Sequence, residues 1–261
     1  MTRTIIITGA SSGIGYALAE HLASLGHAVI ATGRNKESLS KLQQSHPDQI
    51  STVVADLNTT DDLSKIQRAL PHNQTEIHLI HNAGIAKPAL LENMTESEWD
   101  EHVTVNLKSP LFLTKLLLPN LKNGGRVLNI STGVAHRPLI GFPAYGITKA
   151  AFFNLKEYGN TEFNKYDIAF GSAMPGIVDT PIQEHLRDYS ADQFPAVDLF
   201  RGFKQRDELL SPNTAAKFLA WLLLNTTKDQ FVKGDWDIYD SSHHQFWATQ
   251  GEVKDRNMKS S

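Results

Sequence analysis

The strongest constraint on the fold is the alternation of short, β-branched apolar runs with longer amphipathic segments. The apolar runs span residues 4–8, 28–32, 51–55, 77–81, 126–130 and 168–173. Segments between them, such as 13–25, 36–44, 60–70 and 144–163, carry apolar residues at the three- and four-residue spacing of helices. Strands that are apolar along most of their length are typical of parallel sheets covered by helices on both faces. The pattern predicts an α/β fold with a doubly wound parallel sheet, a Rossmann-type three-layer arrangement.

The length of 261 residues suits one large α/β domain, and no repeat or long Gly-, Ser- or Pro-rich linker divides it. We therefore predict a single domain over residues 1–240. Within it, residues 181–211 are polar and aromatic with weak periodicity, and we interpret them as a lid over the substrate. Residues 241–261 are predicted to be a polar C-terminal tail with a mobile end.

Composition limits the partners that the chain can have. A formal net charge of −3 gives no basic excess for nucleic acid, and no stretch reaches the roughly 18 to 20 apolar residues of a membrane helix. The absence of cysteine excludes disulfides and thiolate ligands and fits a reducing, cytoplasmic setting. The 11 histidines, including the adjacent pair His243 and His244, lack the spacing of metal ligands. We expect no nucleic-acid, membrane or metal partner.

A glycine-rich turn joins the first apolar run to the first helical segment. It runs from Thr8 to Gly15 with glycines at G-x-x-x-G-x-G spacing, which differs from G-x-G-x-x-G. Backbone N–H groups and the positive end of a helix in this position can hold a pyrophosphate, and glycine allows the tight turn and the close approach. The turn predicts a dinucleotide site formed by Gly9, Ser11, Ser12, Gly13, Ile14 and Gly15.

The end of the second apolar run bears on the choice of dinucleotide. Folds that bind NAD often place an acidic residue there, about 20 residues beyond the turn, to accept hydrogen bonds from the ribose 2′-hydroxyl. This chain has Arg34 instead, and a guanidinium suits a 2′-phosphate. NADPH is therefore the expected cofactor, with a solvated surface charge as the alternative interpretation of Arg34.

Tyr145 and Lys149 are four residues apart and so share one face of the helix expected there. A nearby cation stabilises a phenolate, and lowering a phenol pKa from near 10 by about three units takes roughly 4 kcal/mol. The pair therefore predicts a proton-transfer site, although an ordinary surface helix pair is the default interpretation of such spacing alone.

Six motifs, in this order and spacing, resemble the short-chain dehydrogenase/reductase family over about residues 3–240. They are the turn 8–15, Asn82-Ala83-Gly84, Asn106, Asn129-Ile-Ser-Thr132, Tyr145-x-x-x-Lys149 and Pro175-Gly176-Ile-Val-Asp-Thr180. The resemblance implies that Tyr145 donates a proton to the substrate oxygen while hydride arrives from the nicotinamide. It implies that Lys149 binds the nicotinamide ribose and that Asn106 holds a water in the proton relay.

The resemblance also implies the remaining cofactor contacts. These are Asp56 and Leu57 beside the adenine, Asn82, Ala83 and Gly84 beside the adenine ribose, and Pro175, Gly176, Val178 and Thr180 at the nicotinamide. Two of the residues have structural alternatives: a polar residue at a helix bend for Asn106 and a helix N-terminal cap for Asp56.

One position departs from the family pattern. Family members usually have serine 13 residues before the catalytic tyrosine, where this chain has Thr132 preceded by Ser131. Thr132 can donate the same hydrogen bond to a carbonyl oxygen, although its methyl group takes up more space. Because successive strand residues point to opposite faces, we expect Thr132 to bind substrate and Ser131 to point away.

A narrower resemblance lies towards the C-terminus. Leu210-Ser-Pro212-Asn, and Phe231-Val-Lys-Gly234-Asp-Trp-Asp237-Ile-Tyr239-Asp240, are similar to sepiapterin reductases and bacterial benzil reductases. This resemblance implies an α-dicarbonyl substrate, a diketone or a pterin side-chain ketone, anchored by Asp237; a solvent-facing strand carboxylate is the alternative. Four lid residues either line an apolar pocket or form a small core of their own: Phe194, Leu199, Phe200 and Phe203.

Two other functions remain open at this stage. One is a noncatalytic NADPH-binding regulator, and the only sequence feature that supports it is Thr132 in place of the usual serine. The other is a reductase of the same family that acts on fatty-acyl, sugar or steroid carbonyls. The resemblance further implies a homodimer or homotetramer formed through the long helices around Asn106 and Tyr145.

Overall fold

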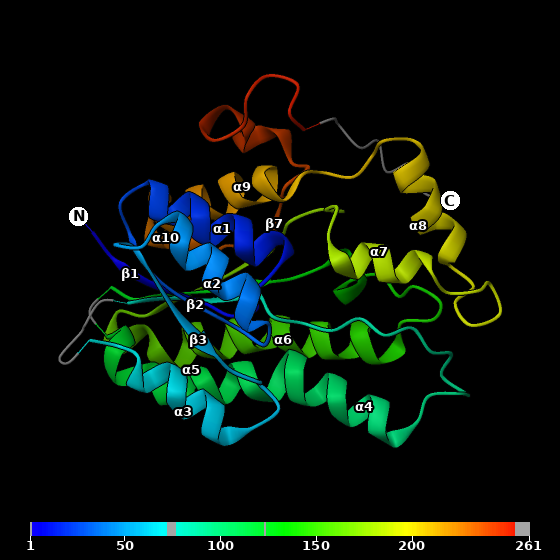
Figure 1. Ribbon diagram of the computed structural model, residues 1–261, viewed down its shortest axis with the longest axis horizontal. Coiled ribbons are helices and arrows are strands. Elements are labelled where there is room, and N and C mark those ends of the chain that lie inside the picture. The colour runs from blue at the N-terminus through cyan, green and yellow to red at the C-terminus, as the bar shows by residue number, and fades with distance from the viewer. Residues whose placement is uncertain (1, 72–76, 123, 254–261) are drawn as a thin grey trace.

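The computed structural model describes residues 2–71, 77–122 and 124–253 and contains one seven-stranded sheet in the order β3-β2-β1-β4-β5-β6-β7 (Figure 1). Every neighbouring pair of strands is parallel. The strands are β1 (Thr4–Ile7), β2 (Ala28–Gly33), β3 (Ile50–Val54), β4 (His78–His81), β5 (Arg126–Ile130), β6 (Ala169–Met174) and β7 (Trp236–Asp237).

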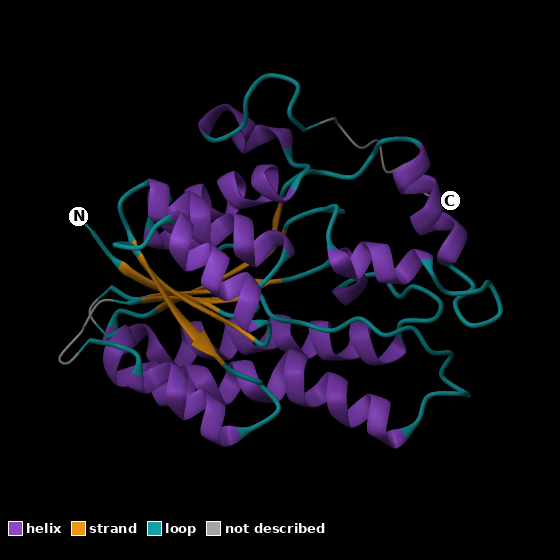
Figure 2. Cartoon of the chain, in the orientation of Figure 1, coloured by secondary structure: helices purple, strands orange, loops and turns teal. Residues whose placement is uncertain are grey.

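Helices cover both faces of the sheet (Figure 2). One layer consists of α1 (Gly13–Ser24), α2 (Lys36–Ser45), α9 (Pro212–Asn225) and α10 (Lys228–Phe231), and the other of α3 (Thr60–Arg68), α4 (Glu96–Val103), α5 (Ser109–Leu121) and α6 (Pro143–Phe163). Two further helices, α7 (Pro181–Arg187) and α8 (Val197–Gln205), lie together beyond the carboxyl ends of the strands. The predicted doubly wound, three-layer α/β fold is confirmed.

Strand β1 shows why the sheet must be covered on both faces. Ile5, Ile6 and Ile7 are each fully buried, yet they belong to two separate apolar clusters. Ile5 and Ile7 pack with the side chains of α1 and α9, whereas Ile6 packs with those of α3 and α5. Successive strand residues point to opposite faces, so a continuous apolar run requires a helix layer on each side.

The strand order locates the site. From β1 the chain adds β2 and β3 on one side, and it then crosses to β4 on the other side of β1. The connections that leave β1 and β4 therefore run in opposite directions along the sheet. Ligands of doubly wound sheets bind at this position, beyond the carboxyl ends of the strands.

Local patterns predicted most elements to within two residues, but two segments differ from expectation. The lid segment 181–211, whose periodicity in the sequence is weak, contains the helices α7 and α8. Residues 241–253 are not a separate mobile tail. Ser241–Phe246 forms a 3₁₀ helix, and His243 is 3% exposed and contacts the rings of Phe218 and Trp221. Residues 254–261 lie outside the described part of the chain.

None of the helices in the described parts of the chain has the length and hydropathy needed to cross a bilayer.

Candidate active site

A pocket of about 840 Å³ opens at the carboxyl ends of the strands. All the predicted site residues line it except Gly15 and Asn106, which lie directly behind its wall. The lining therefore contains Gly9, Ser11, Ser12, Gly13, Ile14, Arg34, Asp56, Leu57, Asn82, Ala83, Gly84, Thr132, Tyr145, Lys149, Pro175, Gly176, Val178, Thr180 and Asp237. Residues from opposite ends of the sequence thus meet around one space.

The glycine-rich turn has a backbone that other residues could not adopt easily. Gly9 has φ +67°, and a methyl group there would lie 2.8 Å from the Cα of Ala83. Gly13 has φ +56°, and a methyl group there would lie 3.1 Å from the Thr180 side chain. A positive φ and backbone contact together exclude a side chain. The turn is therefore pressed against both the β4 end and the segment after β6.

Asn82 holds this turn rather than pointing freely into the pocket. Its amide Nδ2 donates to the carbonyl oxygens of Thr8 at 2.9 Å and Gly9 at 3.0 Å. In return, the Thr8 hydroxyl accepts from the backbone N–H groups of Asn82 and Ala83, both at 3.1 Å. These bonds join the carboxyl ends of β1 and β4 and fix the floor of the pocket.

At the β2 end of the pocket, Arg34 is exposed and makes no hydrogen bond or ion pair with the described residues. Asp56 follows β3 and accepts from the backbone N–H of Asn58 at 3.0 Å. The alternative interpretation of Asp56 as the N-terminal cap of α3 is wrong, because Thr59 is the cap. Both side chains therefore remain at the pocket wall, where the sequence predicted them.

Tyr145 and Thr132 meet at the inner end of the pocket. Tyr145 lies in the first turn of α6 and Thr132 two residues after the end of β5, and their hydroxyls form a hydrogen bond. Burial raises the pKa of Tyr145 to about 12, and the bond to Thr132 opposes that rise. Ser131 instead donates its hydroxyl to Asp235 at 2.7 Å, so the two neighbouring hydroxyls diverge.

Lys149 lies one helical turn beyond Tyr145 and is 4% exposed. Its ammonium donates to the Ile130 carbonyl at 2.8 Å and lies 6.0 Å from the centre of the Tyr145 ring. Burial lowers the pKa of Lys149 to about 8, and the negative charge of Asp235 opposes this. In the protein alone, desolvation of the phenol therefore dominates the pKa of Tyr145. The lowering expected from Lys149 together with the oxidised nicotinamide stays a prediction.

Asn106 lies in a π-helical turn, Thr104–Lys108, between α4 and α5. Asn106 is 1% exposed. Its side-chain oxygen accepts from the Ile85 N–H at 2.9 Å, and its amide nitrogen donates to the Ile85 carbonyl at 3.0 Å. The same nitrogen donates to the Thr148 hydroxyl at 3.2 Å. Asn106 therefore connects the segment after β4 with α6 at an irregular turn of helix, consistent with its helix-bending alternative.

The segment after β6 is bonded to Tyr239, a residue for which the sequence predicted no role. Gly176 has φ +82°, and the Tyr239 hydroxyl accepts from the backbone N–H of Ile177 at 3.0 Å. Val178 forms a parallel bridge with Leu210, so the chain leaves for the lid and returns from it at the same place. The lid segment is thus an excursion that both starts and ends at the pocket.

The lid side chains divide between the two expected arrangements. Phe194 is fully buried in a small apolar cluster with Phe142, Leu186 and Val197. Leu199, Phe200 and Phe203 line the pocket. Asp237 also lines it, and its carboxylate accepts from the Tyr239 N–H at 3.0 Å.

Several pocket residues that lie next to the predicted ones were not predicted from the sequence. They are Ile85, Ala86, Val105, Val134, His136, Leu139, Phe142, Leu186 and Tyr239. For most of these, proximity in sequence to a predicted motif is the only signal, because an apolar residue in a loop gives no pattern of its own.

A groove bounded by a glycine-rich turn at the switch point of a doubly wound sheet, with a phenol, a hydroxyl and a lysine at its inner end, defines an oxidoreductase that uses a nicotinamide dinucleotide. The chain belongs to the short-chain dehydrogenase/reductase family, since its residues 3–191 match the family model described as short chain dehydrogenase. It is accordingly a dehydrogenase or reductase acting on CH–OH or C=O groups.

Similar proteins include two bacterial reductases and a yeast structure. A benzil reductase ((S)-benzoin forming) of Bacillus cereus is 32% identical over 246 residues, which cover 89% of this chain and 97% of that protein. The enzyme of the same name from Bacillus subtilis is 32% identical over 234 residues, covering 86% and 94%. The crystal structure of a short-chain dehydrogenase/reductase from Saccharomyces cerevisiae matches with a TM-score of 0.87 at 26% identity, covering 94% of this chain and 99% of that one.

Proposed function

We propose that the protein is a cytoplasmic, NADPH-dependent carbonyl reductase whose substrates are α-dicarbonyl compounds. The observation that carries this proposal is the convergence of the Tyr145 and Thr132 hydroxyls at the inner end of a mainly apolar pocket, with Lys149 behind them. Similarity to benzil reductases over nearly the full length supports the substrate class.

The residues present fit a nicotinamide dinucleotide. Glycines leave room where a methyl group would meet backbone or neighbouring side chains, at Gly9, Gly13 and Gly176. Ser12 precedes α1 but makes no side-chain cap, so the first N–H groups of that helix remain available to a phosphate. We propose that these residues hold the pyrophosphate, that Asp56 and Leu57 lie by the adenine, and that Pro175, Val178 and Thr180 border the nicotinamide.

Arg34 carries the choice of NADPH over NADH. Arg34 is an exposed guanidinium at the edge of the pocket and has no hydrogen-bond or ion-pair partner among the residues that the structure describes. Such a group is suited to a 2′-phosphate, which it can bind through two parallel hydrogen bonds. We expect Arg34→Ala to raise the KM for NADPH far more than that for NADH. Arg68→Ala, which removes an exposed arginine of α3 outside the pocket lining, serves as the control. Equal effects of Arg34→Ala on both cofactors would rule out the 2′-phosphate contact.

The chemistry assigned to each side chain follows from its place. Bound NADPH supplies the hydride. Thr132 donates a hydrogen bond to the substrate carbonyl oxygen, and Tyr145 transfers its phenolic proton to that oxygen as negative charge develops there. A pKa of about 12 keeps Tyr145 in the protonated form that reduction requires at neutral pH. Lys149 binds the ribose hydroxyls and provides positive charge for the phenolate that remains, while Asn106 holds a water for reprotonation.

The substrate end of the pocket supports a hydrophobic ketone. Leu199, Phe200 and Phe203 from the lid line the pocket, and Phe142 forms its wall beside Tyr145. We propose that this surface contacts the flanking groups of a diketone and excludes water, with Asp237 accepting a hydrogen bond from polar substrates such as a pterin.

NADPH consumption with benzil and 1-phenyl-1,2-propanedione tests the proposal. We expect turnover with both, and weaker or no turnover with a matched panel of fatty-acyl, sugar and steroid carbonyls. Turnover confined to that panel would identify a different reductase of the same family. NADPH binding without consumption of any carbonyl would indicate the noncatalytic regulator.

We also propose that the protein is a homodimer or homotetramer. Apolar side chains are exposed on α5 at Leu111 and Phe112 and on α6 at Ile147 and Tyr158, the two long helices expected to form the interface. Light scattering coupled to size-exclusion chromatography should give a mass of two or four chains, and a mass of one chain would contradict the proposal.

A further inference from the structure

A buried carboxylate that the proposed mechanism does not use lies behind the site. Asp235, two residues before the pocket residue Asp237, has a side chain that is only 6% exposed. Its Oδ2 accepts from the Ser131 hydroxyl at 2.7 Å and lies 2.7 Å from His136 Nε2. Its other oxygen, Oδ1, is buried without a hydrogen-bond partner among the described residues. The hydrogen bonds to this buried carboxylate therefore reach only one of its two oxygens.

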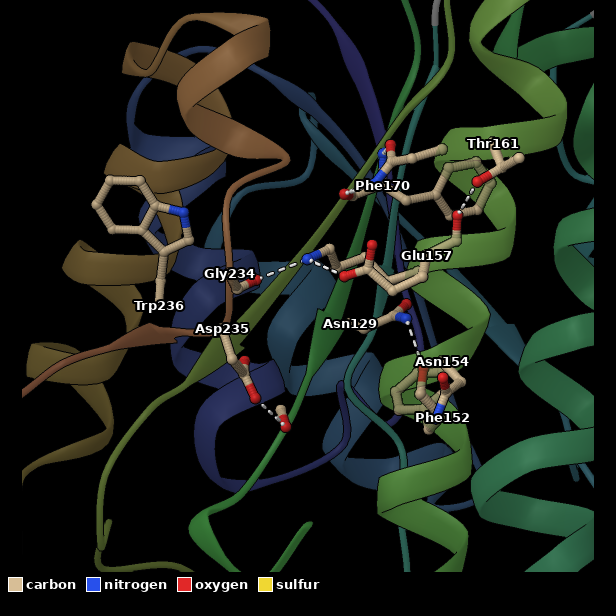
Figure 3. A network of polar contacts seen from close by, with 12 residues as sticks. Asn129, Phe152, Asn154, Glu157, Thr161, Phe170, Gly234, Asp235 and Trp236 are labelled. Atoms are coloured by element: carbon tan, nitrogen blue, oxygen red, sulfur yellow. Dashed lines mark hydrogen bonds and ion pairs between the residues drawn. The ribbon is translucent and has the colours of Figure 1, made fainter. Parts of the chain in front are cut away.

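The chain around Asp235 is fixed from two directions, so the carboxylate has little freedom to move away. Strand β7 begins at the next residue and pairs with the end of β6. On the other side, Lys156 of α6, which is 1% exposed, donates from Nζ to the Gly234 carbonyl at 2.8 Å. Figure 3 shows Gly234 and Asp235 on the segment that leads into β7, with Asn129 and Glu157 on the facing elements.

The same strand end binds both Asp235 and Lys149. Lys149 donates to the carbonyl of Ile130, and Asp235 accepts from the side chain of Ser131, the next residue along the chain. Thr132, which faces Tyr145, follows directly. The carboxylate and the ammonium therefore flank a short segment that leads to the reacting hydroxyls.

Other titratable groups surround Lys149 and Asp235. His81 of β4 is buried close to Lys149, and burial lowers its pKa to about 3, so it carries no charge near neutral pH. Lys156 pairs with Glu157 at 2.8 Å and with the Gly234 carbonyl, and His136 is the partner of Asp235 on the solvent side. Asp237, on the same strand, faces the pocket. Burial lowers the pKa of Lys149, and the negative charge of Asp235 raises it. In a poorly solvated site, a nearby negative charge favours the ammonium form.

We propose that Asp235 is a positioning residue that serves as the buried counter-charge of Lys149, keeping it protonated near neutral pH, with Ser131 and His136 holding the carboxylate in place. The proposal rests on the reductase mechanism only for its catalytic consequence, because the protonation state of Lys149 can be measured without turnover.

The direct test is an NMR titration of Lys149 in the cofactor-free protein. The ¹³Cε resonance of labelled lysine is assigned by its loss in Lys149→Arg. We expect Asp235→Asn to lower the Lys149 midpoint by at least about half a pKa unit, a threefold change in the acid dissociation constant. The matched control is Glu157→Gln, which removes one negative charge from an exposed site on α6, the helix that carries Lys149. This variant should leave the Lys149 midpoint unchanged. An unshifted midpoint in a folded Asp235→Asn protein would overturn the proposal.

Two further variants keep the test decisive. Asp235→Glu restores the charge and should return the Lys149 midpoint towards that of the unmodified protein, whereas Asp235→Ser removes the charge with a smaller side chain that leaves room for water. If Asp235→Asn does not fold, the serine variant must show the downward shift. A shift as large in the glutamate variant as in the neutral ones would mean that packing, not charge, sets the Lys149 midpoint.

Catalysis gives the second measurement. The alkaline limb of kcat/KM for diketone reduction should move to lower pH in Asp235→Asn by the same amount as the NMR midpoint. A shift in the NMR midpoint with an unmoved alkaline limb would show that Lys149 is not the group that limits reduction at high pH, and it would overturn the catalytic role of Asp235. Absence of turnover in the unmodified protein would count against the proposed function and not against the counter-charge.

Discussion

The two ends of the pocket are built from different parts of the chain. At the cofactor end, the walls are mainly backbone: Gly9 touches the main chain of Ala83, and Asn82 is bonded to the turn it supports. At the substrate end, the walls are side chains carried by α7, α8 and the segment after β7. A ligand common to a whole family can be bound by main-chain geometry, whereas a particular substrate is selected by side chains that can change without disturbing the sheet.

This difference makes the two ends respond differently to substitution. A side chain added at the cofactor end has to displace backbone that is bonded to two strands. A side chain trimmed at the exposed part of the lid leaves the hydrogen-bonded frame in place. Tyr145 and Thr132 lie between the two ends, so their variants are expected to change the chemical step most.

Tyr145→Phe should give the largest effect. It removes the proton donor and keeps the ring that packs against Phe142. General acid catalysis contributes about 100- to 10,000-fold, so we expect a fall in kcat of that size. NADPH affinity, measured by the change in cofactor fluorescence, should remain close to that of the unmodified protein. Appreciable turnover by the variant would remove Tyr145 from its assigned role.

Thr132→Ala should lower kcat by about 100-fold, the size of effect seen when one donor to a developing oxyanion is removed. Thr132→Ser keeps the hydroxyl and should remain within a few-fold of the unmodified enzyme. Ser131→Ala is the comparison that separates the neighbours, because Ser131 bonds to Asp235 and not to Tyr145. An impaired Ser131→Ala enzyme beside a normal Thr132→Ala enzyme would reverse the assignment.

Gly9→Ala tests whether backbone contact builds the cofactor end. The new methyl group would lie 2.8 Å from the Ala83 Cα, at a φ of +67°. Gly26→Ala is the matched control, since Gly26 has φ +85° with nothing within 4 Å. Both variants carry the conformational cost of about 1 kcal/mol, but only Gly9→Ala should also weaken NADPH binding, by about tenfold. Equal NADPH dissociation constants for the two variants would show that the contact is unimportant for binding.

The fold and most of the site follow from local sequence, for a physical reason. An apolar run such as Ile5 to Ile7, or a glycine at positive φ such as Gly9, is fixed by its immediate neighbours in the chain. Asp235 could not be found this way, because its partner Ser131 lies 104 residues earlier and nothing in either local pattern indicates burial. The high Tyr145 pKa was missed for a similar reason: desolvation depends on packing from several elements at once.

Acid should lower the free energy of unfolding, because two histidines of β4 are buried in their neutral form. His78 and His81 are buried, and burial lowers the pKa of each to about 3. Because the folded pKa lies below that of the unfolded chain, near 6.5, their contribution to stability is complete above pH 6.5. It is lost as pH falls towards 3, by about 1.4 kcal/mol per pH unit for each histidine.

His81→Gln tests this dependence, because glutamine can still bond to the Thr114 hydroxyl that His81 contacts at 2.8 Å. Urea unfolding at pH 7.5 and pH 5 should show a smaller loss of unfolding free energy in the variant than in the unmodified protein. An equal loss in both proteins would mean that His81 takes up its proton without unfolding.

Leu199→Ala should have the smallest effect and should be confined to the substrate end. Leu199 is 45% exposed in α8 and lines the pocket. Truncation removes part of an apolar wall, so the KM for benzil should rise about two- to fivefold, while the KM for NADPH and the melting temperature change little. Leu25→Ala is the control, as a leucine 54% exposed after α1 and outside the pocket lining. If Leu199→Ala raised the KM for NADPH as much as that for benzil, the lid would act on the cofactor as well, and the division between a backbone-built cofactor end and a side-chain-built substrate end would fail.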